Sequence, residues 1–146
     1  MPRLAMTSPT PSTRRPAIAR LLAAITALYA CVLAFATHYP KPDDLLGPNA
    51  PSDKTLHFLA YATLASLAGS ALLASGRPWR SWAARLGVGL AGFGIADEVT
   101  QPWFRRHADP IDWVYDCIGI GIGIGLVAVA CLGAWMARDR AGKDAT

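Results

Sequence analysis

Residues 97–123 read DEVTQPWFRRHADPIDWVYDCIGIGIG, and they place a dense group of ionisable side chains between apolar sequences. A run rich in Gly and Ala precedes this stretch, and the uncharged run 117–137 follows its last aspartate. Ionisable groups within or at the edge of a bilayer are costly unless they are paired or hydrated. The stretch therefore predicts a polar site at the edge of a membrane-embedded domain.

Helical spacing gives this group of charges a shape. Asp109, Asp112 and Asp116 are spaced i, i+3 and i+7, so they share one face of a helix. Pro102 and Pro110 mark a turn before that helix, because proline tends to end a helix and suits the first turn of the next one. The sequence predicts a helical hairpin with polar side chains at its turn.

The composition indicates a membrane protein of the size of one domain. Of the 146 residues, 53% are hydrophobic and only 16% are charged, and the mean hydropathy is +0.28. Four apolar segments are each about 20 residues long, which is enough for a helix to cross a hydrocarbon core of about 30 Å. They are residues 21–39, 55–75, 81–100 and 117–137. The expected fold class is all-α, a polytopic membrane protein with four transmembrane helices.

The charged residues predict how the helices are oriented. Ten of the 14 lysines and arginines fall in the two terminal segments and in a region that runs from the loop after the second apolar segment into the first turns of the third, as far as Arg85. Positive charge accumulates on the cytoplasmic side, so both termini are expected to be cytoplasmic, in a bacterial inner (plasma) membrane. Cytoplasmic arginines then account for the net charge of +4, and no nucleic-acid partner is expected.

The chain is expected to divide into three parts. Residues 1–16 read as a disordered, basic cytoplasmic tail, residues 17–137 as the four-helix transmembrane domain, and residues 138–146 as a cytoplasmic tail. Ala34-Phe35-Ala36 has the form of a signal-peptidase site. The length of the first apolar run favours an uncleaved helix, and cleavage is the alternative.

The second apolar segment opens with polar residues at helical spacing. Asp53, His57 and Tyr61 are spaced i, i+4 and i+8 and form one stripe, and Ser52 or Asp53 suits the N-cap. An apolar helix buries a histidine and a tyrosine only where another helix or water satisfies their hydrogen bonds. The start of this helix is therefore expected to meet the polar hairpin.

These motifs resemble the VanZ-like family of small bacterial membrane proteins. The resemblance rests on DExxQ, a following arginine and DxxxDxxGxxxG, preceded in the chain by DKxxHFxxY. The matching residues are Asp53, Lys54, His57, Phe58, Tyr61, Asp97, Glu98, Gln101, Arg106, Asp112, Asp116, Gly119 and Gly123. The arginine follows the glutamine by five residues, where some members have six, and Asp116 stands where many members carry asparagine. The family is named after a member associated with glycopeptide resistance, which implies an envelope role without a defined reaction.

The converging helix ends predict a site for an anionic headgroup. The expected catalytic residues are His57, Glu98, Arg106 and Asp112, and the expected substrate-binding residues are Lys54, Tyr61, Asp97, Gln101 and Asp116. Arginine binds phosphate in a bidentate manner, and histidine exchanges protons near neutral pH. We expect the site to face outward and to bind a membrane lipid or a lipid-linked envelope precursor. Chemical modification of the bound molecule is left open, and no cofactor is expected.

Three alternatives remain at this stage. The same charges could lock the helices together or dock a partner, with His57 joining the second and third helices. His57, Glu98 and Asp112 could hold a divalent ion, although a single histidine without HxxxH spacing argues against one. Proton-coupled transport would require ionisable residues at mid-membrane rather than at one end. Asp53 is interpreted as an N-cap, and Arg105 and Asp109 as solvated loop charges.

Overall fold

The computed structural model describes residues 14–40, 47 and 51–144, and all regular structure in those ranges is helical. The predicted all-α class is confirmed. The elements are α1 (Arg14–Thr37), α3 (Asp53–Ala74), α4 (Trp79–Thr100), the short 3₁₀ helix η1 (Gln101–Phe104) and α5 (Pro110–Lys143).

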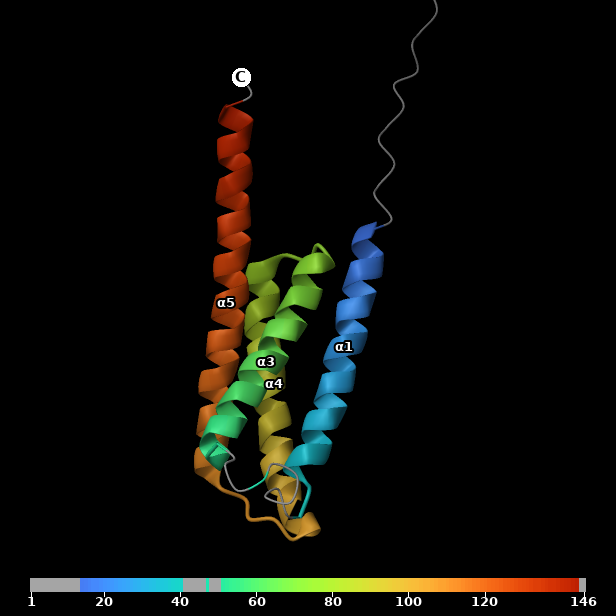
Figure 1. Cartoon of the computed structure of the whole chain (residues 1–146), viewed down its shortest axis with the longest axis vertical. Helices are drawn as coiled ribbons and strands as arrows, with labels where there is room; N and C mark the ends of the chain where they lie inside the picture. Colours follow the sequence, from blue (N-terminus) through green and yellow to red (C-terminus); the bar gives the residue numbers. More distant parts are fainter. Residues whose placement is uncertain (1–13, 41–46, 48–50, 145–146) are drawn as a thin grey trace, which may run out of the picture.

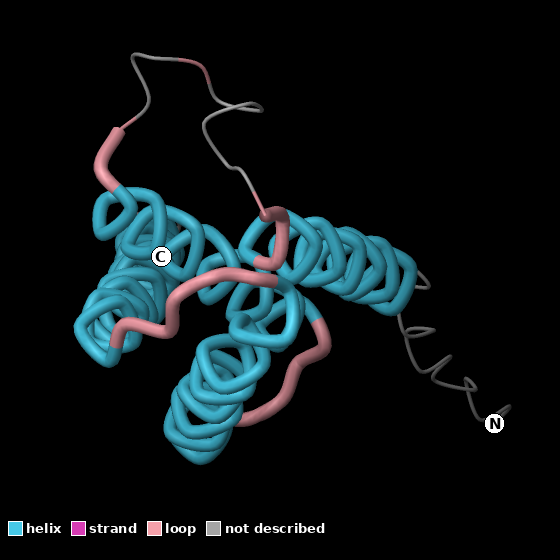
Figure 2. The backbone as a smooth tube through the Cα atoms, turned by 90° about the horizontal axis from the view of Figure 1, so that it is seen from below, coloured by secondary structure: helices cyan, strands magenta, loops and turns pink. Residues whose placement is uncertain are grey.

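The four long helices run up and down beside one another (Figure 1). The first residue of α1 and the last residue of α5 lie at the same end of the bundle, which we call the termini end. The opposite end carries residues 37–40, 51–57 and 97–116 and is called the polar end. Seen from this side, the connections cross the ends of the helices (Figure 2).

Local sequence explains how α3 and α5 begin at the polar end. Ser52 is the N-cap of α3, because its side chain accepts a hydrogen bond from the amide of Thr55. The interpretation of Asp53 as the cap is therefore wrong, and Asp53 is the first helical residue. Asp109 caps α5 by accepting from the amide of Ile111, and Pro110 occupies the first turn. Asp109 is thus more than a solvated loop charge.

Two helix ends differ from the sequence prediction. Helix α1 begins at Arg14, inside the expected tail 1–16, and residues 1–13 lie outside the described residues. Helix α5 continues to Lys143, through most of the expected tail 138–146. Arg140 and Lys143 occupy its last turn, where cations interact favourably with the helix dipole.

The closest helix contact joins α5 to α3 through two glycines. A Cβ atom at Gly119 would collide with the carbonyl oxygen of Phe58, and one at Gly123 with that of Ala62. Gly121 and Gly125 on the same helix have open space at the corresponding position. Small residues allow helix backbones to approach closely in lipid. Here Gly119 and Gly123, which are four residues apart, allow α5 to approach α3.

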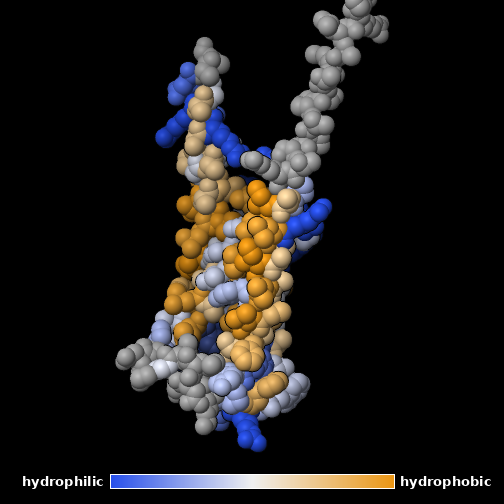
Figure 3. All heavy atoms as spheres, turned by 45° about the vertical axis from the view of Figure 1, so that its right-hand side comes forward, coloured by the Kyte–Doolittle hydropathy of each residue, from blue (hydrophilic) through white to orange (hydrophobic). Residues whose placement is uncertain are grey.

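The face drawn in Figure 3 is largely apolar between the two ends. Exposed leucine, isoleucine, valine and aromatic side chains lie along α1, α4 and α5. Within the described ranges, three helices are long and apolar enough to cross a membrane, namely α1, α3 and α5. These features indicate a membrane protein.

Candidate functional site

His57 lies at the centre of the polar end, where α3, α4 and α5 meet. Its Nδ1 atom is 2.9 Å from Oδ1 of Asp116 on α5 and 3.9 Å from Oε1 of Glu98 on α4. All three residues are buried, and Asp116 is 0% exposed. The hydrogen bond of His57 therefore joins α3 to α5, whereas the structural alternative expected it to join α3 to the third long helix, α4, which His57 contacts only through the 3.9 Å ion pair with Glu98.

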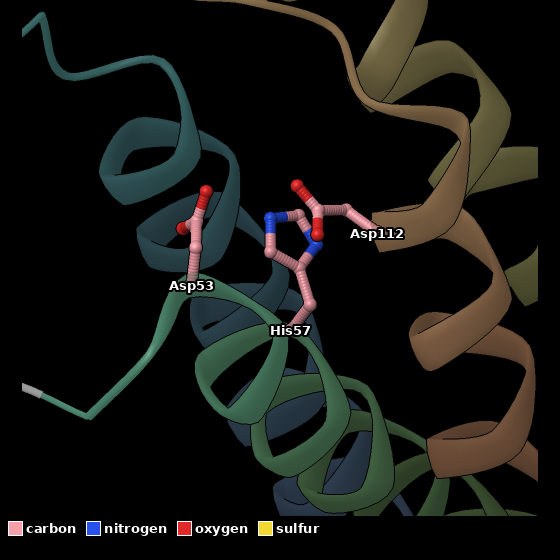
Figure 4. A group of neighbouring side chains, drawn as sticks. All are labelled: Asp53, His57 and Asp112. Atoms are coloured by element: carbon pink, nitrogen blue, oxygen red, sulfur yellow. The ribbon is translucent and has the colours of Figure 1, made fainter.

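Two further carboxylates flank His57 on the outer side of this group. Figure 4 shows its imidazole ring between Asp53 on the same helix and Asp112 on α5. One ligand atom from each of these three residues lies within 4.8 Å of the others. Asp53 is exposed, whereas Asp112 is buried, so this second group opens toward the surface.

The two permanent cations of the site pair with carboxylates on its rim. Lys54 Nζ is 3.1 Å from Asp109 Oδ2 and 3.6 Å from Asp112 Oδ1, and Arg106 Nη2 is 3.5 Å from Asp53 Oδ2. The amide of Ile111 and then Lys54 lower the pKa of Asp109 below its ordinary value. The rim carboxylates therefore have positive neighbours.

Helix α1 also contributes to the site, which the sequence interpretation did not foresee. Thr37 donates a 2.8 Å hydrogen bond to Asp97 Oδ1. His38 Nδ1 lies 3.4 Å from the same oxygen, and His38 Nε2 lies 2.8 Å from the hydroxyl of Thr100. Asp97 is thus oriented toward α1. The polar Thr37-His38 pair at the end of an apolar run was the available signal.

Glu98 is held by one of its two oxygens. Its Oε2 accepts a 3.0 Å hydrogen bond from the backbone amide of Asp109, which fixes the carboxylate relative to the start of α5. Its other oxygen, Oε1, faces His57 and has no hydrogen-bond partner in the part of the chain that the structure describes.

Other buried polar atoms at this end share that property. Among the described residues, seven buried side-chain atoms lack a hydrogen-bond partner: Tyr61 Oη, Asp97 Oδ2, Glu98 Oε1, Gln101 Nε2, Arg106 Nε, Asp112 Oδ1 and Asp116 Oδ2. All seven belong to residues of the predicted site. Buried polar groups in proteins are usually hydrogen-bonded, so the polar end retains hydrogen-bonding capacity that the described side chains do not use.

A cleft of about 230 Å³ opens beside the cluster, between α1 and α3. Its polar part is formed by Thr37, Asp53, His57 and Arg106. The remaining lining is apolar or aromatic and comes from Tyr29, Val32, Leu33, Ala36, Leu56 and Ala60. The cleft therefore has a charged end and an apolar wall.

Eight of the predicted site residues separate into three groups. His57, Glu98, Asp112 and Asp116 form the centre, while Lys54 and Arg106 lie on its rim. Tyr61 and Gln101 are almost completely buried and form the third group. Tyr61 is 0% exposed within the apolar core, with its ring 6.1 Å from that of Phe93, and Gln101 is 1% exposed. Neither Tyr61 nor Gln101 lines the cleft.

Comparisons with family models, with curated proteins and with solved structures give no match to this chain. The resemblance to the VanZ-like family stays a prediction that rests on the motif residues.

Proposed function

We propose that the protein is a VanZ-like inner-membrane protein that crosses the membrane four times and binds a lipid headgroup at its polar end. Both termini are cytoplasmic in this proposal, so the site faces outward. The ligand is an anionic lipid or a lipid-linked envelope precursor whose apolar chain lies against α1 and α3. The cleft with a charged end and an apolar wall is the observation that carries the proposal.

The side chains of the cleft suit the two parts of such a molecule. Arg106 lines it, and the buried Nε of this residue has no partner within the described ranges, so the guanidinium retains a donor for a phosphate oxygen. Asp53 and His57 accept or exchange hydrogen bonds with hydroxyl or amine groups of the headgroup. Ala36 and Leu33 leave room for hydrocarbon along α1.

A structural role is the second candidate, because several charges already have partners. His57 contacts Asp116, Lys54 contacts Asp109, and Arg106 contacts Asp53. In this alternative the groups lock the helices or dock a partner protein without binding lipid. The alternative gives no role to the apolar wall of the cleft or to the Arg106 Nε, which lines it without a partner among the described residues, and headgroup binding is preferred on that ground.

The experiment compares lipid retention by variants of the purified full chain. Native mass spectrometry of protein released from detergent micelles would measure bound phosphatidylglycerol after incubation with a defined excess. Ala36→Trp fills the apolar part of the cleft, and Arg106→Lys keeps the charge but removes the planar fork. We expect each change to reduce the bound fraction by at least about fivefold, roughly 1 kcal/mol of lost affinity.

Ala24→Trp is the matched control, since Ala24 is exposed on the same helix and does not line the cleft. It should retain lipid like the wild-type chain. Equal retention by wild type, Ala36→Trp and Arg106→Lys would reject headgroup binding at this cleft. If the melting temperature falls in Arg106→Lys while lipid retention is unchanged, the structural role is favoured instead.

A further inference from the structure

The carboxylates at the polar end outnumber the cations. Six lie within the cluster: Asp53, Asp97, Glu98, Asp109, Asp112 and Asp116. Lys54 and Arg106 are the permanent cations that pair with them, and both lie on the rim. Within the described segments, neither Glu98 nor Asp116 forms an ion pair with lysine or arginine, so both depend on His57.

Two buried carboxylates that share one imidazole form an expensive arrangement. Burial of ionised carboxylates in a medium of low dielectric constant costs several kcal/mol per group unless opposite charge is close. Even a protonated imidazole would neutralise only one of the two. The remaining negative charge lies where Glu98 is 6% exposed and Asp116 is 0% exposed. A divalent cation at this point would balance the charge of both carboxylates.

The geometry of the three side chains suits a metal ion. Metal–ligand distances of about 2.0–2.2 Å allow two ligand atoms of one ion to lie up to about 4.4 Å apart. The distances of 2.9 Å and 3.9 Å from His57 Nδ1 to the two carboxylate oxygens fall within this limit. Each ligand comes from a different helix, so an ion here would join α3, α4 and α5.

Glu98 provides the second, independent observation. Its Oε2 is held by the amide of Asp109, and the buried Oε1 is directed at His57 without a hydrogen-bond partner among the residues described. Metal-binding carboxylates are commonly oriented in this way, with one oxygen hydrogen-bonded by a neighbouring group. The free oxygen is the one that faces the other two ligands.

We infer that His57, Glu98 and Asp116 form a binding site for one divalent transition-metal ion, of the Mn²⁺ or Zn²⁺ type. One imidazole nitrogen with carboxylate oxygens suits these ions better than Ca²⁺ or Mg²⁺, which prefer oxygen ligands alone. The group of Asp53, His57 and Asp112 is the less suitable of the two, because Lys54 and Arg106 already neutralise its carboxylates. The inference goes beyond headgroup binding and does not require a lipid.

The test measures metal binding by the full chain in detergent without added lipid. Protein stripped with a chelator would be incubated with Mn²⁺, Zn²⁺, Ca²⁺ or Mg²⁺ in separate samples and desalted, and the retained metal would be counted by mass spectrometry. We expect about one Mn²⁺ or Zn²⁺ per chain and no retained Ca²⁺ or Mg²⁺. Glu98→Gln should weaken binding by at least roughly 100-fold, since loss of even an outer-sphere partner costs 10–100-fold.

Two variants locate the ion. Asp139→Asn removes a carboxylate of α5 far from the site and should keep one ion per chain, whereas Asp112→Asn removes a ligand of the neighbouring group and reports which of the two groups holds the ion. Loss of the ion in Asp112→Asn with retention in Glu98→Gln would overturn the assignment. Absence of retained metal in the wild-type chain would also overturn it and would indicate that the carboxylates hold protons instead.

Pulsed EPR on the wild-type chain with Mn²⁺ keeps the inference testable if Glu98→Gln fails to fold. The spectrum should show coupling to one directly bound histidine nitrogen, and an oxygen-only environment would contradict the site. Because these assays contain no lipid, a negative result here leaves the lipid-retention experiment unaffected. A negative result in the lipid-retention experiment likewise leaves the metal-binding inference unaffected.

Discussion

The two ends of the bundle contain the same helices but differ in how those helices hold together. At the polar end, α1 contacts α4 through the Thr37–Asp97 and His38–Thr100 hydrogen bonds, and α3 contacts α5 through His57 and Asp116. Toward the termini end, a crevice of about 720 Å³ separates α1 from α3 and α4. It is lined largely by small and apolar side chains, including Ala23, Ala27 and Ala68.

This difference indicates what each end contributes. In lipid, helices gain little from burying apolar side chains against one another, because the surrounding tails are equally apolar. Specific association then requires close backbone approach or polar contacts, and both occur nearer the polar end. The most buried residues illustrate this, because Gln101 and Asp116 are as buried as Tyr61 and Leu64. The site and the most specific packing of the bundle therefore occupy the same region.

The largest expected effect concerns the backbone contact between α3 and α5 beside the site. Gly119→Leu would drive a side chain into the backbone of Phe58, so the helices would have to separate. We expect loss of the folded state, because overpacking alone costs about 1–3 kcal/mol and a backbone collision more. Gly121→Leu, with open space around it, is the matched control. Thermal unfolding in detergent would compare them, and equal melting temperatures would contradict the proposed packing.

The next effect concerns the buried pair His57–Asp116. Removal of either partner strands the other in a dry environment, and each single change to leucine should destabilise the fold by roughly 3–5 kcal/mol. The double variant should recover part of that loss, because neither member of the pair is then left without the other, although Glu98 still loses its contact with His57. Chemical unfolding of the two singles and the double would measure the coupling. Additive losses would show that the pair does not act as a unit.

The smallest expected effect is a pH dependence at the rim. The folded-state pKa of Asp109 is lowered by the Ile111 amide and by Lys54, so ionised Asp109 stabilises the fold. This contribution is complete above the unfolded-state pKa and disappears as the pH falls through the lowered folded-state value. Asp109→Asn should therefore lower the melting temperature slightly at pH 7, and this difference should shrink as the pH falls below the unfolded-state pKa of aspartate. A difference that does not shrink with falling pH would assign the stabilisation to another cause.

Much of this organisation was predictable because the polar residues are exceptions in an apolar sequence. Burying His57, Glu98 and Asp116 apart from one another would be costly, so these residues were expected to contact one another. Four long helices that run alternately up and down place them at the same end. The helical class followed from equally local rules, and these rules placed the start of α3 at Ser52 or Asp53 without selecting Ser52 as the cap. The transmembrane count and the sidedness of the site stay predictions.

Other features required three-dimensional information. Sequence spacing could not show that Glu98 binds the amide of Asp109, because that contact depends on the path of the chain through η1. Arg105 adopts a left-handed backbone conformation there, with φ of 61°, which no residue preference signals. The choice of Gly119 and Gly123 over Gly121 and Gly125 likewise depends on which face α5 presents to α3.

The most direct test of the difference between the two ends measures from which side of the membrane each end can be labelled. Single cysteines at Ala108, Ser75 and Gly142 would be introduced into a chain whose native cysteines are replaced, and intact cells would be treated with an impermeant thiol reagent. All three positions are exposed; Ala108 belongs to the polar end and the other two lie toward the termini end.

We expect labelling at Ala108→Cys in intact cells, and labelling at Ser75→Cys and Gly142→Cys only after the cells are opened. That result would establish that α4 and α5 cross the membrane and that the site faces outward. Labelling of Ser75→Cys or Gly142→Cys in intact cells, with protection of Ala108→Cys, would contradict the account by placing the charged cluster on the cytoplasmic side.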